Sequence, residues 1–332
     1  MKNYILFLFI FCSVFIGCAK ENSDLFIPYK GNPANDTAWT SHLTANSVAN
    51  HLFDSLVYVP FIDSFNVTGS ALFHVNSNLD VAIPAGSITY TNGSAIPSGK
   101  VRVEIRHLLH SGDFIRYAKP TTSYGKLMES ASGIQIRFFK QNQELALQQG
   151  KKLFFTIKDP NPDGDANVYF GNITPQAPFP TGTNPFFNWT LSTDSSFVSP
   201  FVHHDSTGVT KGYQMFAGKI NWINTQYFID SLSLKTQVTS TLPANFTNTN
   251  TTMFVIIKQH KIVAQLNGDF SSHTFSAPNI PTGSSVIFVS LSLIGNQYYL
   301  GAKEATVTKN LVTIVNPSPK TKAEINQFLD RL

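Results

Sequence analysis

The chain has little of what would indicate a disulfide-stabilised or a nucleic-acid-binding protein. Cysteine occurs only at positions 12 and 18 of the 332 residues. Charged residues make up 13% of the chain, and the net charge of +4 includes no basic run longer than Lys151 and Lys152. Nucleic-acid binding requires a clustered basic surface, so the sequence predicts no nucleic-acid partner. Beyond the amino terminus, no apolar run reaches the roughly 20 residues of a membrane-spanning helix.

The amino terminus is organised as an export signal that ends at a cysteine. Residues 4–16 are thirteen mostly apolar residues behind a short basic start, a run too short for a stable spanning helix. The Phe-Ile-Gly-Cys sequence at positions 15–18 resembles the bacterial lipobox, in which the cysteine is acylated and becomes the new amino terminus. The resemblance implies a lipoprotein signal peptide at residues 1–17 and acyl chains, palmitate among them, on Cys18.

Lipidation of Cys18 would anchor the mature chain to a membrane through its amino terminus. Several acyl chains together hold a protein on a bilayer with negligible release. Cys12 leaves with the signal peptide, so the mature chain has no disulfide and depends on burial of its core. The polar residues 18–45 predict a tether, and we expect an outer-membrane protein that faces the periplasm or the cell surface. The alternative is an ordinary signal peptide whose removal leaves an unpaired thiol.

Short apolar runs separated by turn residues predict an all-β fold. Residues 101–105 alternate between apolar and charged side chains, a period of two that is typical of a half-buried strand. Residues 134–138 repeat this alternation. Strands of this kind at spacings of about ten residues predict a first antiparallel β-sandwich over residues 46–158.

We expect a second antiparallel β-sandwich after a turn-rich segment. Residues 159–212 are dense in Pro, Asn, Asp and Gly, and they predict a linker together with the start of the second domain. Strand-length runs return over residues 213–332. The capping-box sequence Thr-Lys-Ala-Glu at 321–324, followed by apolar residues at 325, 328, 329 and 332, predicts a short carboxy-terminal helix against the second sandwich.

Several passages resemble a family of uncharacterised Bacteroidota outer-membrane lipoproteins. Those in the first half are IPAGS at 83–87, SGKVRVEI at 98–105, PTTSYGKLMES at 120–130, GIQIRF at 133–138 and QELALQQGKKL at 143–153. In GKINWINTQYF at 218–228, Trp222, Ile223, Asn224 and Phe228 match the family's Gly-Trp-Ile-Asn-Cys-Asp-Arg-Phe signature, whereas Thr225, Gln226 and Tyr227 depart from it. The resemblance covers roughly residues 70–332. It implies two β-sandwich domains, the first similar to the sandwich of ankyrins and netrin receptors, and it implies no reaction.

A run of alternating oxygen-bearing side chains is a candidate calcium site. These residues lie around Gly164, at Asp159, Asn161, Asp163, Asp165 and Asn167. Ca²⁺ binds carboxylate and amide oxygens, and a glycine allows the sharp turn that gathers them. Position twelve of the run is Phe170, where an EF-hand has its bidentate glutamate. An acidic turn with its charges in water is the favoured interpretation, with Ca²⁺ binding as the alternative and no other cofactor expected.

Sequence patterns typical of catalysis are scarce. His203 and His204 are adjacent, and neighbouring residues of a strand point to opposite faces, so they predict surface histidines rather than a zinc site. The chain has no Gly-x-Ser-x-Gly motif, and no spacing indicates a pair of catalytic carboxylates. We therefore expect a protein that is not an enzyme, with a metal-dependent hydrolase as an alternative.

Three tryptophans are candidates for a surface that binds sugars. An aromatic ring packs against the apolar C–H face of a sugar, and neighbouring polar groups bind its hydroxyls. Trp189 lies in a Pro- and Asn-rich segment, which predicts exposure, and Trp39 is a second candidate. Trp222 lies on an alternating strand and is predicted to be buried. Core packing is the alternative for each of them.

These patterns favour a membrane-anchored, exported lipoprotein that acts as a non-catalytic binding or scaffolding module. Its expected partners are the membrane, through the amino-terminal lipid, and a polysaccharide or a surface protein. A glycan-binding accessory lipoprotein at the cell surface is the alternative that the aromatic residues indicate.

Overall fold

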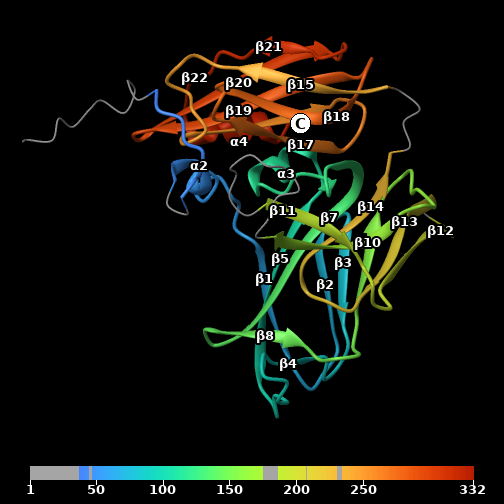
Figure 1. The fold of residues 1–332 in the computed structure, drawn as a ribbon. Helices are drawn as coiled ribbons and strands as arrows, with labels where there is room; N and C mark the ends of the chain where they lie inside the picture. The colour runs from blue at the N-terminus through green and yellow to red at the C-terminus, as the bar shows by residue number, and fades with distance from the viewer. Residues whose placement is uncertain (1–36, 45–46, 175–185, 207, 230–233) are drawn as a thin grey trace, which may run out of the picture. The chain divides into compact units, whose positions relative to one another are not determined.

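Most of the regular structure of the protein is β-strand (Figure 1). The computed structural model describes residues 37–44, 47–174, 186–206, 208–229 and 234–332. Residues 37–332 form one compact unit. The all-β fold with a short carboxy-terminal helix that the sequence predicts is confirmed. The helices of the described residues are α2 (Val48–His51), α3 (Ser111–Arg116) and α4 (Lys322–Leu329).

Two sheets form the first sandwich. The main path of the nine-stranded sheet runs β1 (Phe61–Asn66), β5 (Lys100–Leu108), β7 (Lys126–Lys140), β14 (Asn221–Phe228), β10 (Asn167–Thr174) and β11 (Phe186–Leu191). The strands attached beside this path are β4 (Ile88–Tyr90), β6 (Thr122–Ser123) and β8 (Gln143–Leu147). The five-stranded sheet has the order β12 (Phe197–Asp205), β13 (Gly208–Ala217), β9 (Leu153–Lys158), β3 (Leu79–Ile83) and β2 (Ala71–Asn76).

A third, eight-stranded sheet contains the remaining strands. Its order is β21 (Val312–Ile314), β15 (Lys235–Thr241), β18 (Thr274–Pro281), β17 (Ile262–Asp269), β16 (Thr251–Ile257), β19 (Ser285–Ile294), β20 (Gln297–Thr306) and β22 (Ser318–Lys320). Residues 262–266 of β17 pair with β16, whereas residues 267–269 pair with β18. The sheet therefore has two parts that share this strand, and one core contains side chains from both.

The alternating strands form the core of the first sandwich, as the sequence predicts. Val101, Val103 and Ile105 of β5 are at most 1% exposed. They belong to the same core cluster as Phe155 and Ile157 of the five-stranded sheet. Each fully buried side chain of this size contributes about 1.5–3 kcal/mol of hydrophobic stabilisation.

Two strands that the sequence analysis assigned to the second sandwich lie in the first. Residues 208–217 form β13, which pairs with β9, and residues 221–228 form β14, which pairs with β7. The turn-rich segment that starts at residue 159 therefore does not separate the two sheet systems. The chain leaves the first sandwich only after β14, because β10 to β14 complete both of its sheets.

A buried apolar layer joins the two sheet systems. Every residue of β16 is buried. Phe254 and Ile256 face a cluster that also contains Phe114 and Met128 of the first sandwich. The side chains between them, such as Val255, face the core of the eight-stranded sheet instead. Because successive strand residues point to opposite faces, a strand covered on both sides has a continuous apolar run, here residues 253–257.

The carboxy-terminal helix forms where the capping box predicts it. Thr321 Oγ1 accepts a hydrogen bond from the Glu324 N–H at 3.2 Å, and Glu324 Oε2 accepts one from the Thr321 N–H at 2.8 Å. Ile325 and Leu329 of α4 are fully buried. They pack in the apolar layer that also includes α3, so the helix contacts the first sandwich as well as the second. Gly112 of α3 is required there, because a Cβ at that position would clash with the carbonyl of Leu329.

Candidate functional site

Cys18 and the signal peptide at residues 1–17 lie outside the described residues. Lipidation of this cysteine therefore stays a prediction from the sequence. In the part of the chain that the structure describes, no helix has the length and apolar character needed to cross a membrane.

The acidic loop between β9 and β10 turns its side chains toward its own backbone. Asp159 Oδ1 accepts a hydrogen bond from the Asn161 N–H at 2.9 Å, and Asp163 Oδ1 accepts one from the Asp165 N–H at 2.7 Å. The Asn167 side-chain amide donates to the Asp165 carbonyl at 2.7 Å. Among the described residues, no three or more His, Cys, Asp or Glu side chains gather to hold a metal. These short side chains close local turns in this structure, and Ca²⁺ binding by the loop stays a prediction from the sequence.

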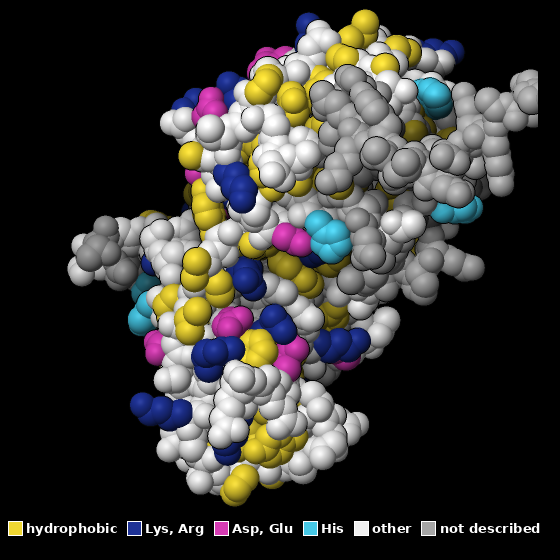
Figure 2. Space-filling model, turned by 90° about the vertical axis from the view of Figure 1, so that its left-hand side faces the viewer, with side chains coloured by type: hydrophobic (Ala, Val, Ile, Leu, Met, Phe, Trp, Pro, Cys, Tyr) yellow, Lys and Arg dark blue, Asp and Glu magenta, His cyan; other side chains and the backbone are white. Residues whose placement is uncertain are grey.

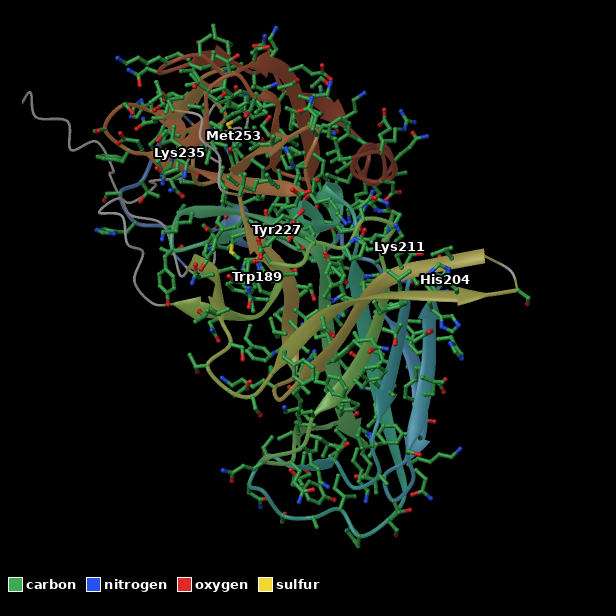
Figure 3. All side chains as sticks on the ribbon, turned by 90° about the vertical axis from the view of Figure 1, so that its right-hand side faces the viewer. Trp189, His204, Lys211, Tyr227, Lys235 and Met253 are labelled. Atoms are coloured by element: carbon green, nitrogen blue, oxygen red, sulfur yellow. The ribbon has the colours of Figure 1, made fainter. Side chains whose placement is uncertain are left out.

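The two adjacent histidines do not form a metal centre either. His203 and His204 are exposed residues of β12. Figure 3 shows His204 on the β12–β13 hairpin, away from Trp189. The described residues place no cluster of metal-binding side chains around them. Within the described part of the chain, the pair therefore lacks the additional ligands that a zinc site requires.

Trp189 is a core residue, contrary to the exposure that its Pro- and Asn-rich surroundings predict. It is fully buried, and its indole Nε1–H donates to the Pro120 carbonyl at 2.9 Å. Its ring meets the Phe187 ring edge-on, with centroids 4.8 Å apart. The prediction was wrong because the segment pairs as strand β11 with β10. Trp189 therefore supports the neighbouring Phe187 ring from within the core.

Trp39 attaches the described end of the predicted tether to the eight-stranded sheet. Its ring stacks on His273, with centroids 5.3 Å apart and planes 9° apart. The adjacent Thr40 exchanges two backbone hydrogen bonds with the Asn248 side chain, at 3.1 and 2.7 Å. This part of the predicted tether at residues 18–45 therefore packs on the folded unit, and Trp39 is half-buried.

Trp222 is half-buried and lines a surface pocket, although the sequence predicts it to be a core residue. The pocket has a volume of about 380 Å³. We call it the Trp222 pocket. Its lining combines aromatic, amide and charged side chains: Lys119, Gln135, Arg137, Glu144, Gly171, Asn172, Phe187, Asn221 and Trp222. The Phe187 and Trp222 rings meet edge-on at 6.2 Å. Alternation along β14 puts Ile223 in the sandwich core and Trp222 on the opposite, outer face.

A close approach of the backbone makes room for this aromatic pair. Gly171 of β10 lies beneath the rings, opposite Trp189 of β11 in the strand register. A Cβ at Gly171 would clash with the Phe187 ring and lie 2.6 Å from Trp222 Cβ. Only glycine therefore allows both rings to close over β10.

The turn after α3 places Lys119 at the pocket. Ala118 adopts a left-handed backbone with φ of 50°. The Lys119 N–H donates to the Phe114 carbonyl at 2.7 Å, which closes the carboxy terminus of the helix. Lys119 Nζ lies 4.3 Å from the centroid of Phe187 and 5.2 Å from that of Trp222. A left-handed conformation is unfavourable for alanine by about 1–2 kcal/mol, and such strain is concentrated at functional sites.

A row of polar side chains forms the wall beside the rings. Arg106 donates to Gln135 Oε1 at 2.8 Å, and Gln135 Nε2 donates to Asn221 Oδ1 at 3.2 Å. Arg137 donates two hydrogen bonds to Glu144, at 2.8 and 3.0 Å. This contact raises the pKa of Arg137 and lowers that of Glu144, so both remain charged near neutral pH. The wall is therefore pre-organised by its own hydrogen bonds.

Burial shifts the pKa of the pocket lysine. Desolvation lowers the pKa of Lys119 to about 8, because removing the ammonium from water disfavours its charged form. On the face of the molecule drawn in Figure 2, the two signs of charge are mixed. Figure 2 shows Lys and Arg side chains interspersed with Asp, Glu and hydrophobic side chains on one face. A charged ligand would therefore be recognised by local contacts rather than by a long-range field.

The sequence carried only a faint signal for this pocket. Asn221 and Trp222 are adjacent in the chain, and Phe187 belongs to the aromatic run around Trp189. Nothing in the sequence connects them with Lys119, because strand pairing alone brings these segments together. Comparisons of the chain with protein-family models and with curated proteins give no match. The functional assignment therefore depends on the geometry of the pocket and on the amino-terminal sequence.

Proposed function

We propose that this protein is an exported, membrane-anchored lipoprotein that binds saccharides through the Trp222 pocket. The observation that carries the proposal is the composition of one pocket. The rings of Trp222 and Phe187 lie beside the side-chain amides of Gln135, Asn172 and Asn221. Saccharides have apolar C–H faces that pack on aromatic rings, and hydroxyls that exchange hydrogen bonds with amides. The pocket volume of about 380 Å³ is in the range of about 300–1,000 Å³ found for small-molecule sites.

The chemistry of the lining favours binding over hydrolysis. Most glycosidases use two carboxyl groups on either side of the bond that is broken. The described lining contributes one carboxylate, Glu144, and Arg137 holds it in a bidentate ion pair. This pairing lowers the pKa of Glu144, whereas a general acid requires a raised one. The protein is thus proposed as a binding module, in agreement with the expectation from its sequence.

The proposed location comes from the amino-terminal sequence. The lipobox-like residues 15–18 support acylation at Cys18 and anchoring in an outer membrane. The resemblance to Bacteroidota lipoproteins supports the same location. A surface lipoprotein with a saccharide pocket would retain polysaccharide near the cell.

Saccharide binding is tested by affinity electrophoresis of the full-length protein in detergent through gels that contain single polysaccharides. We expect at least one polysaccharide to retard the protein. Trp222→Ala should then lower the affinity about tenfold, since an aromatic contact contributes about 0.5–1.5 kcal/mol beyond the area that it buries. Phe270→Ala, which removes an exposed aromatic ring outside the pocket lining, is the control and should migrate like the unmodified protein. Absence of retardation by any polysaccharide, or full retardation of Trp222→Ala, would contradict the proposal.

Anchoring is tested separately in cells. Membrane and soluble fractions are compared for the unmodified chain and for Cys18→Ala, and the amino-terminal peptide is analysed by mass spectrometry. We expect an acylated Cys18 in the membrane fraction and release of the variant. A variant that stays in the membrane without an acyl group would show that another feature anchors the protein.

A further inference from the structure

Among the described residues, no carboxylate pairs with the ammonium of Lys119. Desolvation is the cause of its lowered pKa, with no contribution from a nearby carboxylate. Its ammonium faces the rings of Phe187 and Trp222 instead. Cation–π contacts replace only part of the hydration that a desolvated ammonium loses. An anion in the pocket would therefore be bound more strongly than an anion on an open surface.

The other charged groups of the pocket do not neutralise Lys119. Glu144 is the carboxylate of the described lining, and both of its oxygens accept hydrogen bonds from Arg137. Arg106, behind Gln135, adds a further positive charge, and its buried Nε–H has no hydrogen-bond partner in the described structure. Among the residues that the structure describes, the pocket therefore has an excess of positive charge.

The position of this charge fits a substituent at the edge of a sugar ring. Lys119 Nζ lies 5.2 Å from the Trp222 centroid, so a ring packed on the exposed part of Trp222 has the ammonium beside it. A pyranose with a carboxylate in place of its exocyclic hydroxymethyl group carries its charge just outside the ring. Charge-assisted hydrogen bonds are roughly twice as strong as those between neutral groups. A neutral sugar would leave the ammonium without this partner.

The geometry points to selectivity for acidic saccharides. Resting on the saccharide-binding function proposed above, we propose that the Trp222 pocket binds a uronic acid. Its carboxylate accepts a hydrogen bond from Lys119, its ring packs on Trp222, and its hydroxyls bind the amides of Gln135 and Asn172. The protein would accordingly retain acidic polysaccharides in preference to neutral ones.

Two methyl glycosides isolate the contribution of the carboxylate. Methyl β-glucuronide and methyl β-glucoside differ only at the exocyclic carbon, and single sugars avoid the non-specific attraction of a polyanion. Binding to the full-length protein in detergent is measured by NMR titration at constant ionic strength. We expect the glucuronide to bind at least about tenfold more tightly, as a charge-assisted hydrogen bond predicts.

Variants separate the charge of Lys119 from its packing. Lys119→Met keeps an apolar chain over the rings and should lower glucuronide affinity about tenfold, with glucoside affinity unchanged. Lys119→Arg keeps the charge and should preserve the preference for the glucuronide. Lys211→Met removes an exposed lysine of β13, outside the pocket, and should change neither affinity (Figure 3).

The outcomes distinguish this inference from the proposed function. Equal affinities for the two glycosides, or an unchanged preference in Lys119→Met, would overturn acidic selectivity. Saccharide binding itself would still stand if Trp222→Ala weakened both glycosides. Absence of binding to either glycoside and to every polysaccharide would overturn both proposals.

Discussion

Arg116 is the buried cation that connects the carboxy-terminal helix to the first sandwich. Its side chain is fully buried. It donates to Asp113 Oδ1 at 2.7 Å and to Asp330 Oδ1 at 2.6 Å, and it lies 4.1 Å from the Tyr58 ring centroid. A further hydrogen bond runs from the guanidinium to the Asn326 carbonyl of α4, at 3.3 Å. One guanidinium therefore holds three segments together: helix α3, the α4 end of the chain and the segment of Tyr58.

The effect of Arg116→Met can be worked out from the exposure of its partners. Removing one partner of a buried ion pair costs about 3–5 kcal/mol, because the other charge is left without compensation. The Asp113 side chain is 18% exposed, but that of Asp330 is 48% exposed and can be hydrated. We therefore expect the free energy of unfolding to fall by about 3 kcal/mol, the lower end of this range. The control Asp330→Asn removes only the half-exposed partner and should cost about 1 kcal/mol or less.

Hydrogen exchange followed peptide by peptide is the most direct assay. In Arg116→Met, residues 322–332 should lose protection before the strands of either sheet system. The reason is that α4 loses its polar contact with α3, whereas the strands keep their backbone hydrogen bonds. Urea unfolding of the same variants gives the change in global stability. A loss below about 1 kcal/mol, together with unchanged exchange of residues 322–332, would refute the role assigned to Arg116.

Three further predictions test the core, the helix cap and the pocket. Trp189→Phe should lower the free energy of unfolding in urea by about 2 kcal/mol, because it removes a buried indole hydrogen bond and leaves a void. A decrease under about 0.5 kcal/mol would contradict the packing described. Thr321→Ala should destabilise α4 by about 1 kcal/mol and speed its amide exchange, and unchanged exchange would argue against the cap. Glucuronide affinity should fall as pH rises through the Lys119 pKa of about 8, because the ammonium loses its proton, while glucoside affinity stays constant. Arg137 and Glu144 keep their charges from about pH 6 to about pH 10, so a titration that is flat over this range would exclude Lys119 as the anion contact.

Features that arise from neighbouring residues could be predicted from the sequence. Alternation at residues 101–105 predicts strand β5, because one face of that strand packs in a core. The cap of α4 depends on side chains only three positions apart, at Thr321 and Glu324. Both predictions required no knowledge of which strand pairs with which.

Features that arise from long-range pairing could not be predicted. The Pro- and Asn-rich surroundings of Trp189 indicated an exposed loop, whereas pairing with β10 buries the residue in a strand. The pocket needs β14 to pair with both β7 and β10, which brings Trp222 beside Phe187. A β-strand pattern shows that one face is buried, but it does not show which neighbour covers it.

The sequence by itself determined the all-β class, the terminal helix and the expectation of an acylated amino terminus at Cys18. Each of these depends on side-chain periodicity, capping or a short motif within a few consecutive residues. Only the tertiary structure decided that Trp189 supports the pocket from within while Trp222 lines it. It also decided that Lys119 faces the two pocket rings, because the turn after α3 lies far from β11 and β14 in the chain and is brought to them by packing.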